Sequence, residues 1–274
     1  MVGAAVAAGI NYFDLFVGTP GTREYYGKAL KDVRDKVYLA GHLGCADVDG
    51  QYVKTRDENL SREFLEQFYD KLGTDYIDVL FLHNCDEESD LDHILNGWMY
   101  AYAKELKAAG RVKFIGLSTH STDIAVAAVK SGKLDVLMFP VNPLFNLLPQ
   151  DSADARMKGR EVRSMTQEER DAYPTKQALY DLCGKMGVPI VAMKPFAAGN
   201  VLKGHEDGRL KGLLELTPVQ CISYILSIPQ VACPVPGFAS VDELNQSLAW
   251  LTASEEERES KINEFVAALD RILK

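Results

Sequence analysis

Three residues that could move protons or bind a metal stand in or beside short apolar runs. Asp14 lies within one run that is typical of a β-strand, His83 ends another, and His42 follows a third. If these runs are parallel strands of one barrel, their carboxyl ends form one rim, and we expect the three side chains to meet there. A histidine beside a carboxylate is an acid–base pair, since the carboxylate fixes its tautomer and raises its pKa. The same set could ligate Zn²⁺ or Fe²⁺, or His42 could simply fill space and hydrogen-bond Asp14.

The runs that position these residues alternate with helical patterns. They are apolar nearly throughout, as is typical of parallel strands buried on both faces. The expected strands cover residues 12–16, 37–41, 77–83, 113–118, 136–141, 189–194 and 231–235. The expected helices cover residues 23–30, 59–71, 95–109, 121–131, 176–185 and 218–227. No Gly-x-Gly-x-x-Gly motif follows an early strand, which favours a closed barrel over an open dinucleotide-binding sheet.

The sequence therefore predicts an α/β fold, a (β/α)8 barrel of the TIM type that lacks its first strand. Residues 3–9 read as the tail of the first helix, so the missing strand would precede them. We expect one domain over residues 1–274, with residues 147–173 forming a rim loop or lid and residues 254–274 a C-terminal helix. An unpaired parallel edge favours association, so a second copy or another partner could cover this seam.

The composition narrows the class of partner. The net charge is −9 and the isoelectric point near 5.1, which argues against nucleic acid or an anionic membrane as the main partner. The five cysteines are widely spaced, with no CxxC pair, which suits a reducing compartment. No signal peptide or long apolar run is recognisable, so we expect a cytoplasmic protein acting on a small molecule.

Several blocks resemble the aldo-keto reductase superfamily. They are residues 11–14 (NYFD), 26–30 (YGKAL), 34–38 (RDKVY), 72–78 (LGTDYID), 110–118 (GRVKFIGLS), 192–199 (AMKPFAAG), 216–221 (LTPVQC) and 234–237 (PVPG). Residues 50–56 (GQYVKTR) and 135–139 (DVLMF) resemble in particular the bacterial subgroup with a C-terminal iron–sulfur tail. That cysteine-rich tail is absent here, so no iron–sulfur cluster is expected.

The resemblance implies NAD(P)H-dependent carbonyl reduction by an Asp, a Tyr, a Lys and a His at the barrel rim. Asp14 and His83 match the Asp and His positions, whereas His42 stands where the family has its Lys. The Tyr position falls on residues 16–19 (FVGT), which contain no phenol. Because neither Phe nor Thr can replace a phenol as the acid, we expect a degenerate tetrad with weakened acid catalysis.

The resemblance also implies a set of cofactor-binding residues at the strand ends. They are Ser118, Thr119, Lys194, Phe196, Gly237 and Ser240. The family binds the 2′-phosphate of NADPH with basic residues just after the last strand, but residues 237–244 hold two carboxylates and no Lys or Arg. A phosphate would meet negative charge there, so either NAD or NADP remains open as the cofactor. No metal site is assigned.

Three functions stay open at this point. The first is an oxidoreductase that transfers hydride between NAD(P)H and a carbonyl or alcohol. The second is a non-redox lyase or isomerase that uses the His42, Asp14 and His83 rim. The third is a non-catalytic subunit that binds a partner at the missing-strand seam. The resemblance favours the first, although a fold does not by itself decide a function.

Overall fold

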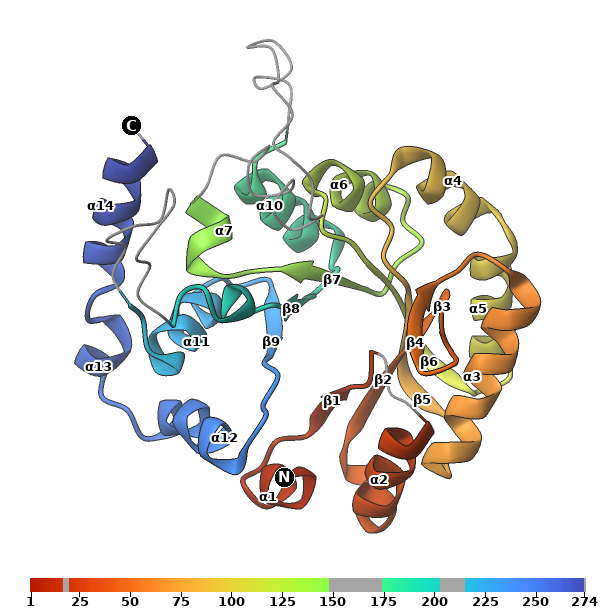
Figure 1. Cartoon of the computed structure of the whole chain (residues 1–274). Coiled ribbons are helices and arrows are strands. Elements are labelled where there is room, and N and C mark those ends of the chain that lie inside the picture. The colour runs from red at the N-terminus through yellow and green to blue at the C-terminus, as the bar shows by residue number, and fades with distance from the viewer. Residues whose placement is uncertain (17–19, 148–173, 203–214, 274) are drawn as a thin grey trace. The chain divides into compact units, whose positions relative to one another are not determined.

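The computed structural model describes residues 1–16, 20–147, 174–202 and 215–273. The loop or lid expected at residues 147–173 therefore lies, beyond its first residue, outside the described residues. The chain divides into two compact units, Met1–Met138 with Met186–Val188, and Phe139–Lys185 with Pro189–Lys274. Figure 1 shows the elements of both units, and each unit is described by itself.

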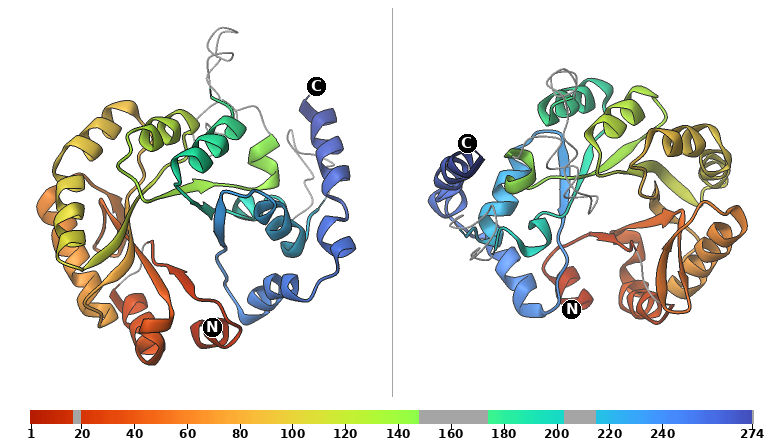
Figure 2. Two further views of the ribbon diagram at one scale, coloured as in Figure 1. Left: turned by 180° about the vertical axis from the view of Figure 1, so that it is seen from behind. Right: turned by 45° about the horizontal axis from the view of Figure 1, so that its top comes forward.

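The first unit alternates strands and helices. Its elements are α1 (Val2–Ala7), β1 (Tyr12–Asp14), α2 (Pro20–Leu30), the 3-10 helix η1 (Lys31–Lys36), β2 (Tyr38–Leu43), β3 (Cys45–Val48), β4 (Gln51–Lys54), α3 (Glu58–Leu72), β5 (Ile77–Leu82), α4 (Glu88–Asn96), α5 (Trp98–Ala108), β6 (Val112–Ser118) and α6 (Thr122–Lys130). The strands lie in the order β1-β2-β5-β6-β7 and adjacent strands run parallel. Helices α3, α4 and α5 cover the outer side of these strands (Figure 2).

Strand β7 (Val136–Pro140) runs from the first unit into the second. The second unit continues with α7 (Pro143–Leu147), α10 (Lys176–Met186), β8 (Ile190–Met193), the 3-10 helix η2 (Ala197–Gly199), α11 (Pro218–Leu226), β9 (Val231–Val235), α12 (Val241–Leu248), the 3-10 helix η4 (Ala249–Leu251), α13 (Glu255–Glu259) and α14 (Ile262–Leu273). Its strand order is β7-β8-β9, and β8 and β9 are parallel. The expected seven-stranded sheet is confirmed.

Local signals explain where key helices begin and end. Asp57 caps α3 by accepting a hydrogen bond from the Leu60 amide, and Gly73 ends the same helix with a φ of 64°, in the left-handed region. Thr217 and Gln220 form a reciprocal capping box at the start of α11. Strand β5, which follows α3 in the chain, is buried at every position, as its apolar run predicts.

Three expectations about the elements are corrected. The helix expected at residues 95–109 is two helices, α4 and α5, separated at Gly97, which adopts an extended conformation. The helix expected at residues 254–274 is also two, α13 and α14, because Lys261 between them has a φ of 67°. The antiparallel hairpin of β3 and β4 was not expected at all.

The hairpin follows β2 directly and packs on α3. Asp49 and Gly50 form its two-residue turn, with φ of 53° and 77°, as a type I′ turn requires. Cys45 and Ala46 are buried against Phe64 of α3. The chain enters the hairpin at Gly44, which has a φ of 99° and no room for a Cβ beside Arg56. Figure 1 shows this hairpin beside β2 and α3.

Candidate active site

Parallel pairing brings the three predicted residues to one end of the first unit's strands. Asp14 is the last residue of β1, and His42 lies within β2, which extends beyond the predicted strand. His83 follows β5 immediately, and its amide donates to the Leu43 carbonyl of β2 at 2.8 Å. The expectation that Asp14, His42 and His83 meet at one edge is therefore confirmed, whereas their catalytic role stays a prediction.

The three side chains form a continuous chain of hydrogen bonds that ends on a fourth. His42 Nε2 lies 2.9 Å from Asp14 Oδ1, and His42 Nδ1 lies 3.0 Å from His83 Nδ1. His83 Nε2 lies 2.9 Å from the hydroxyl of Tyr52. Both histidines are buried, at 5% exposure, while Tyr52 is 43% exposed. This chain of hydrogen bonds thus runs from two buried histidines to an exposed tyrosine.

Tyr52 is the residue that sequence reasoning missed. A phenol was sought two to five residues after Asp14, but Tyr52 lies on β4 of the hairpin. The Asp49-Gly50 pair was a usable signal, because Asp-Gly between two β-prone segments is typical of a type I′ hairpin. Recognising that hairpin would have placed Tyr52 on a short strand next to His42, although not its contact with His83.

Phe16 packs over the whole chain of polar groups. Its ring centroid lies 4.9 Å from that of His83, 5.5 Å from that of His42 and 5.5 Å from that of Tyr52. Phe16 is itself 41% exposed and is the first of the four residues, 16–19, among which the family resemblance placed a tyrosine. An aromatic ring in this place shields the hydrogen bonds from water and leaves the phenol edge open.

Burial controls the ionisation of this cluster. Desolvation lowers the pKa of His83 from 6.5 to about 2, and the charges of His42 and Arg56 act in the same direction. Burial raises the pKa of Tyr52, against a hydrogen bond from the Asn84 side chain that lowers it. Burial also raises the pKa of the Cys45 thiol to about 12, so this cysteine is not a thiolate nucleophile. His83 and Tyr52 are therefore neutral near pH 7.

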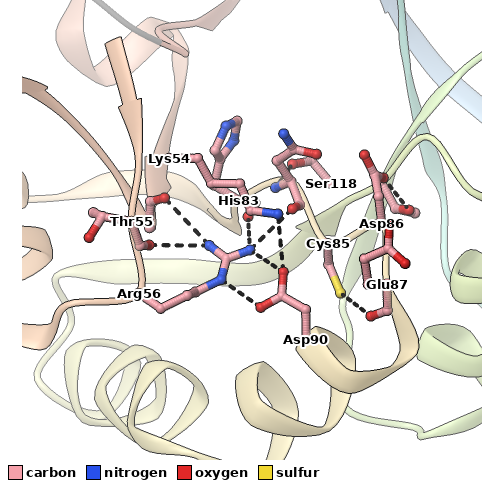
Figure 3. Close-up of polar contacts among 12 residues, drawn as sticks. Lys54, Thr55, Arg56, His83, Cys85, Asp86, Glu87, Asp90 and Ser118 are labelled. Atoms are coloured by element: carbon pink, nitrogen blue, oxygen red, sulfur yellow. Dashed lines mark hydrogen bonds and ion pairs between the residues drawn. The ribbon is translucent and has the colours of Figure 1, made fainter. Parts of the chain in front are cut away.

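Arg56 clamps the hairpin to the strand ends that carry the site (Figure 3). Its guanidinium donates to the carbonyls of His83 at 2.9 Å and Asn84 at 3.1 Å, next to the end of β5. Both carbonyls accept from Nη2, and Nε together with the same Nη2 holds the Asp90 carboxylate of α4 at 2.7 and 2.6 Å. Lys54 of the hairpin adds a second ion pair to Asp90 at 3.2 Å. Arg56 and Asp90 thus position the backbone on both sides of the Tyr52–His83 contact.

The predicted cofactor residues of the first unit are buried at the end of β6. Ser118 Oγ accepts from the backbone amide of Asn84 at 2.9 Å, and Thr119 Oγ1 donates to the Asp86 carboxylate at 3.1 Å. Asp86 also accepts from the ring and the amide of His120. Asn84 Oδ1 is buried without a hydrogen-bond partner. An unsatisfied amide oxygen is a free acceptor for a polar ligand group.

The predicted cofactor residues of the second unit follow β8 and β9. Lys194 adopts a φ of 54°, and its carbonyl accepts from Asn142 Nδ2 at 3.0 Å. Phe196 packs against the apolar core of its unit. A Cβ at Gly237 would meet nothing within 4 Å, and Ser240 caps α12. Their role as cofactor ligands stays a prediction.

Two absences hold over the described residues. No group of three or more His, Cys, Asp or Glu side chains within those residues is arranged to hold a metal ion. Likewise, none of the helices that the structure describes is long and apolar enough to cross a membrane.

Comparison with known proteins decides the family. The model of the aldo/keto reductase family matches residues 1–267. The chain belongs to this family. Its fold is similar to that of an aldo-keto reductase from Bacillus halodurans in its holo form, with a TM-score of 0.70, 20% identity, and coverage of 96% of this chain and 85% of that one. This similarity confirms the predicted α/β barrel class.

Two curated proteins are similar to this chain over part of their length. The L-glyceraldehyde 3-phosphate reductase of Escherichia coli is 22% identical over 211 residues, 73% of this chain and 53% of that protein. The D-threo-aldose 1-dehydrogenase of a Pseudomonas species is 30% identical over 180 residues, 55% of this chain and 51% of that protein. The matches thus span about half the length of these aldo/keto reductase relatives.

Proposed function

We propose that this aldo/keto reductase family member is an oxidoreductase that interconverts a small carbonyl compound and its alcohol with a nicotinamide dinucleotide. The observation that carries the proposal is the hydrogen-bonded set of Asp14, His42 and His83 at the strand ends of a chain from this family. Catalysis then proceeds on an altered tetrad, in which His42 takes the place of the lysine. The names of the curated relatives suggest L-glyceraldehyde 3-phosphate and aldoses as the first test substrates.

The first unit has polar groups that suit the nicotinamide end of such a cofactor. A carboxamide can donate to the unsatisfied Asn84 Oδ1 and can exchange a hydrogen bond with the Ser118 hydroxyl. When bound, the nicotinamide supplies or accepts the hydride. Lys194, Phe196, Gly237 and Ser240 stay the proposed ligands in the second unit.

The start of α12 does not suit the 2′-phosphate of NADP. Glu243 Oε2 accepts from the Ala239 amide at 2.7 Å, and Ser240 Oγ accepts from the Glu243 amide. A carboxylate thus already occupies this helix N-terminus, and Asp242 adds a second negative charge in the first turn. We therefore propose NAD rather than NADP as the cofactor. The proposal involves no iron–sulfur cluster, although residues 50–56 and 135–139 resemble the subgroup that carries one.

Fluorescence titration tests the proposal directly. We expect saturable binding of NADH, several-fold weaker binding of NADPH, and turnover with at least one aldehyde or alcohol that His42→Ala abolishes. Glu243→Gln keeps an acceptor for the Ala239 amide but removes the charge, so it should reduce the difference in affinity between NADH and NADPH. Glu256→Gln on α13 is the matched control. Absence of saturable binding of either cofactor at millimolar concentration would refute the proposal. Activity without any cofactor would favour a lyase or isomerase instead.

A further inference from the structure

We propose that Tyr52 exchanges the proton with the substrate and that His83, His42 and Asp14 form a relay behind it, whose direction is set by the protonation of His42. This inference rests on the proposed function. It starts from the unbroken sequence of contacts from Asp14 Oδ1 through both imidazoles to the Tyr52 hydroxyl, at 2.9, 3.0 and 2.9 Å.

The hydrogen-bond partners determine the tautomers when both histidines are neutral. An ionised Asp14 can only accept, so the proton of His42 lies on Nε2 and its Nδ1 is a bare acceptor. His83 must then donate from Nδ1 to His42 Nδ1, which leaves His83 Nε2 bare. Tyr52 consequently donates its hydroxyl proton inward, to His83 Nε2. One lone pair of its oxygen accepts from the Asn84 side chain, and the other is left to accept a proton from the substrate.

Protonation of His42 reverses the outer half of the relay. Both nitrogens of His42 then donate, Nε2 to Asp14 and Nδ1 to His83 Nδ1. His83 becomes the opposite neutral tautomer and donates from Nε2 to the Tyr52 oxygen. The Tyr52 hydroxyl proton is then free to point outward. One added proton thus turns Tyr52 from an acceptor into a donor toward the substrate.

The two states serve the two directions of the reaction. In oxidation, the alcohol C–H bond breaks and its hydride, with both electrons, goes to the nicotinamide. The alcohol O–H proton goes to the Tyr52 oxygen, while Tyr52 passes its own proton to His83 Nε2 and His83 passes one from Nδ1 to His42. His42 ends as an imidazolium beside Asp14. Carbonyl reduction reverses every one of these transfers and returns His42 to its neutral form.

The surroundings suit a relay more than a static hydrogen bond. Burial and its charged neighbours lower the pKa of His83, so His83 changes tautomer without holding a charge of its own. Phe16 covers the two imidazoles. Of the three hydrogen-bonded rings, His42 and His83 are buried and Tyr52 is exposed. The other titratable groups acting on these residues are Arg56, Lys54 and His120 near His83, Tyr26 and Cys45 near Asp14, and Cys45, Arg56 and Asp86 near Tyr52.

The first experiment reads the tautomers in the protein without cofactor. Imidazole ¹⁵N spectra at neutral to alkaline pH should show the proton on Nε2 of His42 and on Nδ1 of His83. Tyr52→Phe should shift only the bare Nε2 of His83. Tyr100→Phe is the matched control, because it removes a different phenol hydrogen bond, to the Lys133 carbonyl, and should leave both histidines unchanged. A proton on His83 Nε2 in the neutral state would overturn the relay.

The second experiment measures turnover in both directions. Tyr52→Phe should lower kcat about 10²–10³-fold for oxidation and for reduction, because it removes the acid–base group. Its NADH affinity should be unchanged, and Tyr100→Phe should resemble the wild type. In the wild type, reduction should fall and oxidation should rise with increasing pH, because reduction consumes the proton that oxidation releases. A Tyr52→Phe enzyme within threefold of wild type would refute the role of Tyr52. Failure of the wild type to bind a dinucleotide would instead refute the proposed function, and the ¹⁵N spectra would still decide the relay.

Discussion

Replacing Arg56 by lysine should loosen the end of the first unit that carries the candidate site. Arg56 makes hydrogen bonds to the backbone carbonyls of Gly44, Thr55, His83 and Asn84 and a two-point contact with Asp90. A lysine keeps the positive charge, but it has one nitrogen in place of three. It therefore cannot replace Nε, which donates to Asp90, and Nη1, which donates to the Gly44 and Thr55 carbonyls.

The expected cost follows from the bonds that a lysine cannot replace. A hydrogen bond to a charged group contributes about 1.5–3 kcal/mol, and at least the bonds from Nε to Asp90 and from Nη1 to the Thr55 carbonyl are lost. Arg56 is 19% exposed, so water can partly solvate these partners and the lower figure applies. Arg56→Lys should therefore cost about 3 kcal/mol, or about 6–12 °C in Tm for a chain of this size.

Thermal and urea unfolding, followed by circular dichroism, measure this loss. Arg111→Lys is the matched control, because Arg111 also grips a carboxylate at two points, that of Glu66, but with 33% and 48% exposed side chains. Its loss should stay below about 1 kcal/mol. Equal losses in the two variants would refute the reasoning, since the carbonyl contacts of Arg56 would then contribute nothing to stability.

Two further predictions concern packing and acid stability. Gly27→Ala should destabilise the protein by about 1–3 kcal/mol in urea unfolding, because its Cβ would lie 2.7 Å from the Leu72 carbonyl oxygen. Gly3→Ala, whose Cβ would meet nothing within 4 Å, should unfold at the same or a higher urea concentration. Burial would raise the pKa of Asp86, but hydrogen bonds from His120 outweigh it and lower the pKa to about 2. The stabilisation is complete above the unfolded pKa near 3.9 and is lost as the pH falls towards 2. The stability advantage of wild type over Asp86→Asn should therefore shrink across that range in pH-dependent unfolding.

The sequence predicted the strands well because each carries its own signal. Buried parallel strands must be apolar on both faces, and β5 reads that way at every position but Asp78. The exception has a structural reason: Asp78 accepts from Arg34, Lys113 and the Leu39 amide. Helix α3 is likewise marked by Asp57 at its start. Breaks such as that at Lys261 were missed, because a positive φ in a lysine leaves no mark in composition or periodicity.

The sequence determined one part of the acid–base set, and the tertiary structure determined the other. The sequence by itself determined that Asp14, His42 and His83 lie in or beside strands, and parallel pairing then makes their meeting at one edge a consequence of local patterns. Only the tertiary structure decided that Tyr52 completes the set, because its contact with His83 joins residues 31 positions apart through a hairpin folded onto α3. Asp49-Gly50 marks the turn of this hairpin locally, but packing between distant segments decides where the hairpin lies. The phenol that residues 16–19 lack is supplied in the structure by Tyr52 of β4.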